Sequence, residues 1–518
     1  MTELEPTSLK ETVVRGAGLA GAGYVVGQVL TLGFYVVLAR LASPQDFGQF
    51  AAGSVLVFVG LLFSESGMMA AVIQRRDRIE EAASTAVVAT AASGSGLTLA
   101  ALGAAPLVGL VFDSETIGKV AAATSGMVLL HSLQVVPEAL MQRQFSFVRR
   151  LIIQPAGVLA FGMGAVIATA NGLGVWGLVI GYYCGAVIEV GLSWGLVGWR
   201  PQLRLASFAM WRELIGYGRF VLASVAIMRL GEQVPVVLIG RGVGTNALGQ
   251  YRYAGRIAAT PLALIVQAAA YVIFPALSRI AINRERLRGA SVQSLLLMCA
   301  VGFPLGLLVI PLGIPAAVIV FGDVWEEAGK AAMFLVGLPI GATLISFASE
   351  VVKADGRSDI QARLHVVTVI SSTLFMVALL PFGLMGVCAG VSLGTLVGGS
   401  YAVWRVKNLL ELPYRELLSA VSTPLLAGAL MVAVLAPVEF LAVDVRARGT
   451  PAGLVLLGAE AFVGLAVYAA ALRLLAPGTF RELATAMGQL GAMVAKPLRG
   501  RRPGVDWARP QPPDDRAE

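Results

Sequence analysis

Two arginines four residues apart, Arg252 and Arg256, lie within an apolar stretch of the chain. Residues at this spacing project from the same face of a helix. A guanidinium group donates paired hydrogen bonds and stays charged, so two of them on one face can bind a phosphate or another anion. A charged side chain inside an apolar helix is costly unless it faces protein or water. We therefore expect both arginines to face a hydrated interior, or Arg252 to extend toward the polar end of its helix.

Further ionisable residues fall inside apolar stretches, where each needs a polar partner or a cavity. Arg229 and Glu232 are three residues apart, so they either neutralise each other or extend the basic surface of Arg252 and Arg256. Glu65 lies between two serines and is expected to pair with an arginine across a cavity or to titrate. The other ionisable residues of this kind include His131, Glu138, Glu189, Glu350 and Glu460.

The chain has few residues for metal binding or covalent catalysis. It contains two histidines and three cysteines, and the cysteines lie far apart in apolar stretches. A metal centre, a disulfide framework and a cofactor are therefore not expected, and we predict that the protein is not an enzyme. Both histidines are interpreted as packed polar residues rather than proton relays. We expect Glu138 to pair with Arg143 and Glu350 to pair with Lys353.

The elements that must position these residues are membrane helices. Hydrophobic residues make up 57% of the 518 residues and charged residues only 14%, whereas a soluble domain carries about 25% charge. A spanning helix needs roughly 20 apolar residues. The apolar stretches predict an all-α polytopic membrane protein of about fourteen transmembrane helices, at 15–40, 47–73, 83–112, 120–142, 151–170, 174–198, 214–240, 247–277, 290–321, 330–352, 364–381, 385–404, 417–438 and 451–475. The stretch 290–321 contains three prolines and is expected to be kinked or broken.

The basic residues indicate the orientation of these helices. Arginines concentrate in alternate loops, for example at Arg75, Arg143 and Arg286, while the opposite loops are poor in them and partly acidic. The positive-inside rule places the arginine-rich loops and both termini in the cytoplasm. This predicts a multi-pass protein of the cytoplasmic (inner) membrane. It also explains the net charge of +8 without nucleic-acid binding.

The ends of the chain read as cytoplasmic tails. The first twelve residues are polar and do not have the order of a signal peptide. After the last span, apolar residues recur at three- and four-residue steps from Phe480 to Val494, and basic residues follow. This pattern predicts either an interfacial helix on anionic lipid or a solvated tail over 477–518.

An internal repeat relates the two halves of the chain. The segment RLASPQDFGQF (40–50) matches RGVGTNALGQY (241–251), which pairs Gly48 with Gly249. The segment GVWGLVIG (174–181) matches GLMGVCAG (383–390), which pairs Gly177 with Gly386. Parallel repeats of this kind place a substrate site between the halves. We predict a six-helix bundle over 1–210, a second over 211–410, two additional helices over 411–476 and a tail over 477–518. We expect Gly48 and Gly249 to serve turn geometry.

The same segments carry a resemblance to a known family. The segments are LARLASPQDFGQF (38–50), SESG (64–67), AVIQR (71–75), PEALMQRQFSF (137–147) and GVWG (174–177). They are similar to Wzx-type polysaccharide flippases, a branch of the multidrug/oligosaccharidyl-lipid/polysaccharide exporter superfamily. The similarity spans about residues 1–410. It implies that the chain flips a polyprenyl-pyrophosphate-linked oligosaccharide from the inner to the outer leaflet.

The resemblance also implies which residues meet the substrate. In related flippases the first, second, seventh and eighth spans line the cleft between the halves. On that layout Arg229, Arg252 and Arg256 form a cationic wall for the pyrophosphate, and Gln28 and Tyr251 are added as substrate-binding candidates. Glu65 and Glu232 are the candidates for coupling or charge pairing. The implied partners are the lipid-linked oligosaccharide, membrane lipids, and a polysaccharide polymerase or export protein.

Three alternative functions remain open at this point. An ion-coupled multidrug exporter of the MATE-like kind shares the two-half bundle, but it binds organic cations and favours an acidic lumen. A lipid II flippase differs only in its substrate. A membrane enzyme acting on the same lipid normally carries a large outer loop or a soluble catalytic domain, and neither is found in this sequence.

Overall fold

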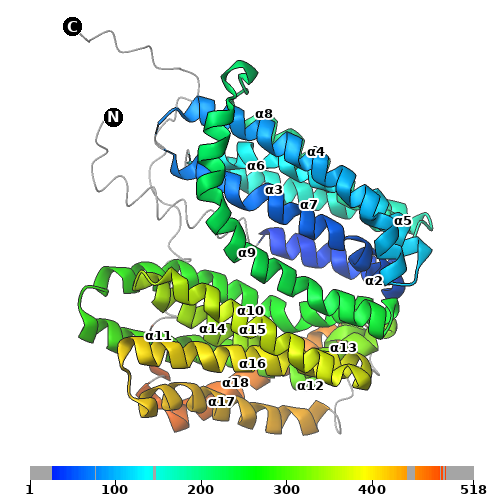
Figure 1. Ribbon diagram of the computed structural model, residues 1–518. Helices are drawn as coiled ribbons and strands as arrows, with labels where there is room; N and C mark the ends of the chain where they lie inside the picture. The colour runs from blue at the N-terminus through cyan, green and yellow to red at the C-terminus, as the bar shows by residue number, and fades with distance from the viewer. Residues whose placement is uncertain are drawn as a thin grey trace, which may run out of the picture.

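The structure is a bundle of long α-helices arranged side by side (Figure 1). It is a computed structural model, and it describes residues 26–75, 77–143, 147–439 and 450–478, together with four residues between 480 and 485. Within these ranges eight helices are long and apolar enough to cross a membrane, or up to ten if each of two bent pairs forms one span. The predicted class of helical, multi-pass membrane protein is therefore confirmed. The predicted tail 477–518 lies almost wholly outside the described residues, as do residues 15–25 of the first expected span.

The chain divides into a first half, a bridging helix and a second half. The first half contains Val26–Leu41, α2 (Pro44–Gly53), α3 (Val55–Gln74), α4 (Ile79–Val111), α5 (Glu115–Thr124), α6 (Met127–Arg143), α7 (Phe147–Ala170) and α8 (Val175–Leu196). The bridging helix is α9 (Phe208–Gly242). The second half contains α10 (Thr245–Ile280), α11 (Arg284–Leu307), α12 (Val309–Ala316), α13 (Glu326–Phe334), α14 (Gly337–Ala354), α15 (Ser358–Leu379) and α16 (Gly383–Leu410). Two further helices, α17 (Tyr414–Pro437) and α18 (Thr450–Leu475), pack at its outer edge (Figure 1).

Several expected single spans are broken in the structure. Residues 47–73 form α2 and α3, and helix Val26–Leu41 meets α2 at a bend of 119°. Ser43 causes this break because its hydroxyl accepts a hydrogen bond from the Asp46 amide at 3.2 Å, and Pro44 suits the first helical position. The expected break within 290–321 is confirmed, since α11 ends at Leu307 and α12 begins at Val309.

The bridging helix α9 belongs to both halves. Its first turns contact α3 and α4, and its later part contacts α10, α15 and α16 (Figure 1). Near its start, Glu213 forms an ion pair with Arg75 at 2.7 Å, and Arg78 lies 3.4 Å from the same carboxylate. These two guanidinium groups, Arg75 foremost, lower the pKa of Glu213 from its usual value. The predicted boundary at 210/211 therefore falls at the start of a helix shared by the two halves.

The two halves meet at one end of the molecule. In Figure 1 they converge where α2, α5 and α13 lie and separate toward the opposite end. Helix α2 packs on α10 so closely that a Cβ on Gly48 would overlap the Thr245 carbonyl, and a Cβ on Gly249 would overlap the Pro44 carbonyl. Both glycines lie inside helices. The expectation that they serve turn geometry is therefore wrong, because they are required for helix contact instead.

Aromatic side chains fill the same end between the halves. The rings of Tyr253 and Trp325 lie 3.8 Å apart, and Phe47 packs edge-on against both. The Trp325 indole donates a hydrogen bond to the Ala39 carbonyl at 2.9 Å, and the Arg40 guanidinium donates to the Ile319 carbonyl at 3.0 Å. These bonds join residues of opposite halves, so this end forms a closed contact that we call the aromatic seal.

Candidate functional site

A pocket between the halves contains the two arginines that are four residues apart. It lies next to the aromatic seal and has a volume of about 160 Å³. Arg252 and Arg256 enter it from α10, and Tyr35 enters from helix Val26–Leu41. The rest of the lining is largely aromatic and apolar and comes from α2, α3, α7 and α8, including Phe47, Phe50, Ser54, Phe58, Phe161 and Leu178. The structure thus brings both predicted arginines into one pocket, which we call the arginine pocket.

The Arg256 guanidinium in this pocket stacks on an aromatic ring. The guanidinium carbon of Arg256 lies 3.2 Å from the centre of the Tyr35 ring, which is a cation–π contact. Within the part of the chain that the structure describes, no carboxylate forms an ion pair with Arg252 or Arg256. Stacking leaves the N–H groups at the edge of a guanidinium available. The arginine pocket can therefore donate several hydrogen bonds to an anion.

The tyrosine of this pocket differs from the one predicted. Tyr251 packs against the buried core, whereas Tyr253 is fully buried and lines the pocket. The Tyr253 hydroxyl donates a hydrogen bond to the Tyr35 carbonyl at 3.1 Å, which connects α10 to the first half. The positions of Tyr251 and Tyr253 in the sequence do not by themselves show which of the two faces the pocket. Tyr251 is not among the described residues that line this pocket.

The remaining predicted site residues lie outside the arginine pocket. Arg229 and Glu232 form an ion pair at 3.4 Å, and both side chains are about half exposed. The alternative in which they pair with each other is the one seen. Gln28 is half-buried on helix Val26–Leu41. The side chain of Glu65, on α3, lies outside the described part of the structure.

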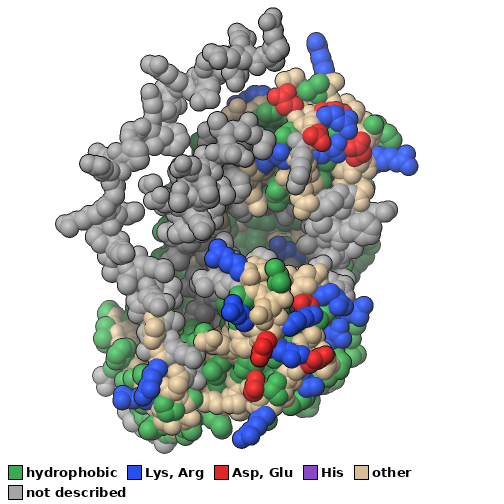
Figure 2. Space-filling model, turned by 90° about the vertical axis from the view of Figure 1, so that its left-hand side faces the viewer, with side chains coloured by type: hydrophobic (Ala, Val, Ile, Leu, Met, Phe, Trp, Pro, Cys, Tyr) green, Lys and Arg blue, Asp and Glu red, His purple; other side chains and the backbone are tan. Residues whose placement is uncertain are grey.

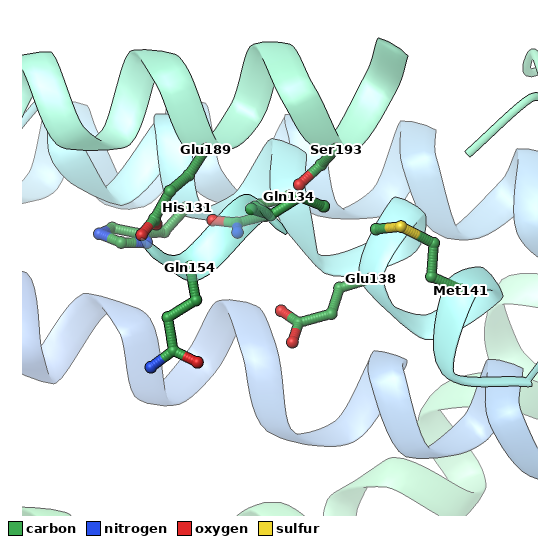
Figure 3. A pocket seen from close by; sticks show the side chains of 8 residues that line it. His131, Gln134, Glu138, Met141, Gln154, Glu189 and Ser193 are labelled. Atoms are coloured by element: carbon green, nitrogen blue, oxygen red, sulfur yellow. The ribbon is translucent and has the colours of Figure 1, made fainter. Parts of the chain in front are cut away.

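A second pocket lies within the first half, among α6, α7 and α8 (Figure 3). It has a volume of about 340 Å³ and, unlike the arginine pocket, a mainly polar lining. His131, Gln134, Glu138 and Met141 come from α6, Ile153 and Gln154 from α7, and Glu189 and Ser193 from α8. We call it the acidic pocket because two glutamates, Glu138 and Glu189, are among its described lining residues. Sequence reasoning named three of these residues separately but did not place them together.

The two pairings expected for glutamates near helix ends have different outcomes. Glu350 is confirmed as the partner of Lys353, with 2.8 Å between the carboxylate and the ammonium nitrogen. Glu138 instead lines the acidic pocket, while the Arg143 guanidinium donates to backbone carbonyls of α3, including Ile73 at 3.1 Å. Arg143 therefore neutralises a helix end. Among the described residues, no group of three or more His, Cys, Asp and Glu side chains is placed to hold a metal ion.

The end of the molecule opposite the seal is hollowed between the halves. Figure 2 views this end and shows Lys and Arg side chains on both the upper and the lower part around the hollow. One ion pair of the second half at this end joins Arg284 to Asp355 at 2.9 Å. The arginine pocket is thus bounded on one side by the aromatic seal, and the charged loops lie at the far end.

Comparison with protein families agrees with this architecture. Residues 37–330 match the family described as "Polysaccharide biosynthesis protein". The matched region includes the seal, the acidic pocket, the bridging helix and every named lining residue of the arginine pocket except Tyr35, and it covers more than half of the chain.

Two curated relatives have similar sequences. The lipopolysaccharide biosynthesis protein WzxC of Escherichia coli (strain K12) is 25% identical over 415 residues, which are 75% of this chain and 79% of WzxC. The succinoglycan biosynthesis transport protein ExoT of Rhizobium meliloti (strain 1021) is 25% identical over 342 residues, or 63% of this chain and 66% of ExoT.

A solved structure has the same fold. It is the lipid II flippase MurJ in an inward closed conformation, with a TM-score of 0.73 at 15% sequence identity. The match covers 90% of this chain and 99% of the MurJ chain. At this identity the likeness concerns the arrangement of helices.

Proposed function

The chain belongs to the polysaccharide biosynthesis protein family, and we propose that it is a flippase for a polyprenyl-pyrophosphate-linked oligosaccharide. The observation that carries this proposal is the arginine pocket, where two guanidinium groups that form no ion pair with a carboxylate of the described residues meet between the halves. A pyrophosphate supplies the paired acceptor oxygens that such groups bind best. The relatives support the assignment, since one is named as a biosynthesis protein and the other as a transport protein for bacterial polysaccharides.

The architecture suits the physical problem of moving such a substrate. Each hydroxyl of an oligosaccharide loses water at a cost unless the protein replaces the lost hydrogen bond. The polyprenyl tail has no such requirement and can stay in lipid. A polar interior between two halves can therefore carry the headgroup while the tail remains outside. A multidrug exporter, by contrast, needs a pocket that attracts cations, and the arginine pocket repels them.

We infer alternating access about the seal. The seal closes one end, and the hollow end carries the arginine-rich loops that the positive-inside rule assigns to the cytoplasm. On this orientation the closed end faces outward, both termini are cytoplasmic, and the membrane is the cytoplasmic (inner) one. Opening the seal while the hollow end closes would move the headgroup across the membrane.

We further propose the arrangement of two six-helix bundles, near 1–210 and 211–410, plus two added helices over 411–476. The repeat supports it: Gly177 lies in the first turn of α8 and packs on α7, and Gly386 lies in the first turn of α16 and packs on α15. We propose fourteen spans in total, of which the described residues supply eight to ten that are long and apolar enough by themselves. A polysaccharide polymerase or export protein is the proposed protein partner.

Within the site we assign unequal roles. Arg252 and Arg256 bind the pyrophosphate. The Arg229–Glu232 pair lies outside the arginine pocket on α9, and we propose that it meets the substrate as the substrate enters. Gln28 is proposed as a polar contact on the helix that carries Tyr35. Tyr251, which packs against the buried core, keeps its proposed role as a substrate contact beside Arg252. Glu65 keeps its proposed role in coupling or charge pairing.

Replacing Arg256 tests the function directly. In a strain that depends on this protein for surface glycan, Arg256→Ala should abolish the glycan while the protein remains in the membrane at normal abundance. Arg256→Lys should restore export only in part, because an ammonium group lacks the paired donors. Arg212→Ala is the matched control, since this arginine is exposed near the start of α9. Full export by alanine variants of Arg252 and Arg256, singly and together, would refute the cationic mechanism.

A further inference from the structure

Another pocket lies on the outside of the second half, among α14, α16 and α17. Its volume is about 190 Å³. Figure 1 shows α17 on the side of the second half that faces away from the first half, so this space is separate from the interior between the halves. Helix α17 packs mainly on α11 and α18 and makes little contact with α16, which leaves a gap between α16 and α17. We call this space the peripheral pocket.

The peripheral pocket has a buried apolar floor and an exposed aromatic and apolar rim. Leu344 of α14 and Leu417 of α17 are buried, whereas Trp404 of α16 and Tyr414 and Leu418 of α17 are exposed. Apolar side chains exposed on the outside of a membrane bundle face lipid. A charged headgroup would lose its water at high cost between such walls. The pocket therefore suits a hydrocarbon chain that enters from the side.

One cationic side chain lies at the edge of this apolar pocket. Lys407 is the charged residue among the described lining, and it comes from the last turn of α16. Its Nζ atom lies 5.3 Å from the centre of the Tyr414 ring and donates to the Asn408 side-chain oxygen at 3.4 Å. Among the described residues it forms no ion pair, and the nearby Glu411 is paired with Arg288 at 2.5 Å. The Lys407 ammonium is therefore available to an anion.

The position of Lys407 along α16 matches the level of lipid headgroups. Helix α16 has 28 residues and is about 42 Å long, whereas the hydrocarbon layer is about 30 Å thick. The last turn of α16 therefore reaches the headgroup region, where Trp and Tyr are enriched and a lysine extends its ammonium toward phosphates. Trp404 and Tyr414 lie beside Lys407 at this level. Since Glu411 pairs with Arg288 of α11, this end of α16 belongs to the hollow end of the molecule.

We propose that the peripheral pocket binds an anionic phospholipid, with one acyl chain in the gap between α16 and α17 and the headgroup phosphate on Lys407. On the proposed orientation this lipid belongs to the cytoplasmic leaflet, whose anionic lipids attract basic side chains near the membrane surface. The bound chain would fill the gap and hold α17 against the second half. The site lies outside the path of the substrate, so this inference does not depend on which substrate is flipped.

The test compares two lipids that have the same chains and different headgroup charges. Native mass spectrometry of the purified full-length protein in detergent measures the Kd of the first bound palmitoyl-oleoyl phosphatidylglycerol or phosphatidylcholine. We expect phosphatidylglycerol to bind about fivefold more tightly, a difference of about 1 kcal/mol. Lys407→Gln should remove this preference by weakening phosphatidylglycerol alone. Ser400→Phe should weaken both lipids, because Ser400 lines the pocket and the added ring occupies the place of the acyl chain.

Two variants outside the pocket serve as matched controls. Arg286→Gln removes a positive charge from an exposed side chain at the same end of the molecule, and Leu374→Phe adds a ring to an exposed position on α15. Both should bind the two lipids as the wild type does. Because detergent has no leaflets, the measurement is independent of the proposed orientation and of glycan export.

Three results would overturn the proposal. The first is equal affinity of the wild type for the two lipids, or an equal loss in Lys407→Gln and Arg286→Gln, which would indicate general surface charge. The second is full affinity for phosphatidylglycerol in Ser400→Phe, which would place the acyl chain elsewhere. The third is displacement of phosphatidylglycerol by an equal concentration of an uncharged polyprenol, which would assign the pocket to a polyprenyl tail.

Discussion

Gly48 of α2 and Gly249 of α10 pack on each other's helices, each facing a backbone carbonyl of the opposite half. The carbonyls belong to Thr245 and Pro44, which precede Gly249 and Gly48 by four residues. The contact is therefore reciprocal, and the same two glycines are the pair that the internal repeat equates. A duplicated sequence has placed the same feature on both sides of one interface. The closed end of the molecule depends on the absence of two side chains.

Gly48→Ala and Gly249→Ala should each disfavour the closed seal. A methyl group forced into a packed contact costs about 1–3 kcal/mol, so the equilibrium shifts toward separation of α2 from α10. In a background without the native cysteines, Ser54→Cys reports from the arginine pocket. Its labelling by a membrane-impermeant thiol reagent from outside should become faster in both glycine variants.

Gly255→Ala is the control for this prediction, because it lies on α10 and nothing approaches within 4 Å of the position of its added Cβ. It should label at the wild-type rate. Equal labelling of all variants would show that the glycine contact does not hold the seal closed.

Tyr35→Leu should weaken anion binding in the arginine pocket. The ring of Tyr35 holds the Arg256 guanidinium at 3.2 Å, and a cation–π contact contributes about 0.5–2 kcal/mol. Titration of the purified protein with inorganic pyrophosphate should show an affinity reduced by about three- to tenfold. Tyr35→Phe keeps the ring and should bind almost as well as the wild type. A phenylalanine variant as weak as the leucine variant would point to the hydroxyl instead.

Glu213 should make a pH-dependent contribution to the stability of the hollow end. The Arg75 hydrogen bond lowers the pKa of this carboxyl in the folded state, so its contribution to stability is present above its ordinary pKa and disappears as pH falls through the lowered value. Glu213→Gln should therefore lower the Tm slightly at pH 7, and the difference should vanish in strongly acidic buffer. Thermal unfolding at both pH values measures it. A difference that grows with acidification would contradict the assignment.

Reporter fusions test the orientation. A fusion at Asp113, next to the seal, should report the outside, and one at Arg286, at the hollow end, should report the cytoplasm. A fusion at Arg446 should also report the outside, and one at Arg76 should also report the cytoplasm. An inverted result at either of the first two positions would reverse the direction of the transport cycle.

Local properties of the chain were sufficient to predict the membrane helices and the common face of Arg252 and Arg256. Apolar stretches of about 20 residues specify membrane helices wherever they occur, because lipid leaves the backbone no other partners. The four-residue spacing of Arg252 and Arg256 puts them on one face through helix geometry alone. The cost of burying charge then implied a cavity, and the structure contains it. These inferences needed no knowledge of neighbouring helices.

Tertiary packing decided which side chains meet. Tyr253 rather than Tyr251 lines the arginine pocket, because the rotation of α10 is set by its contacts with α2 and α13. Glu138 and Glu189 come from helices separated in sequence, and only the packing of α6, α7 and α8 brings them to one cavity. The sequence around Gly48 favours a turn residue, and only the contact of α2 with α10 shows that Gly48 serves helix packing. Periodicity is a property of one helix, whereas a pocket is a property of the space between several, and that space exists only once they are packed.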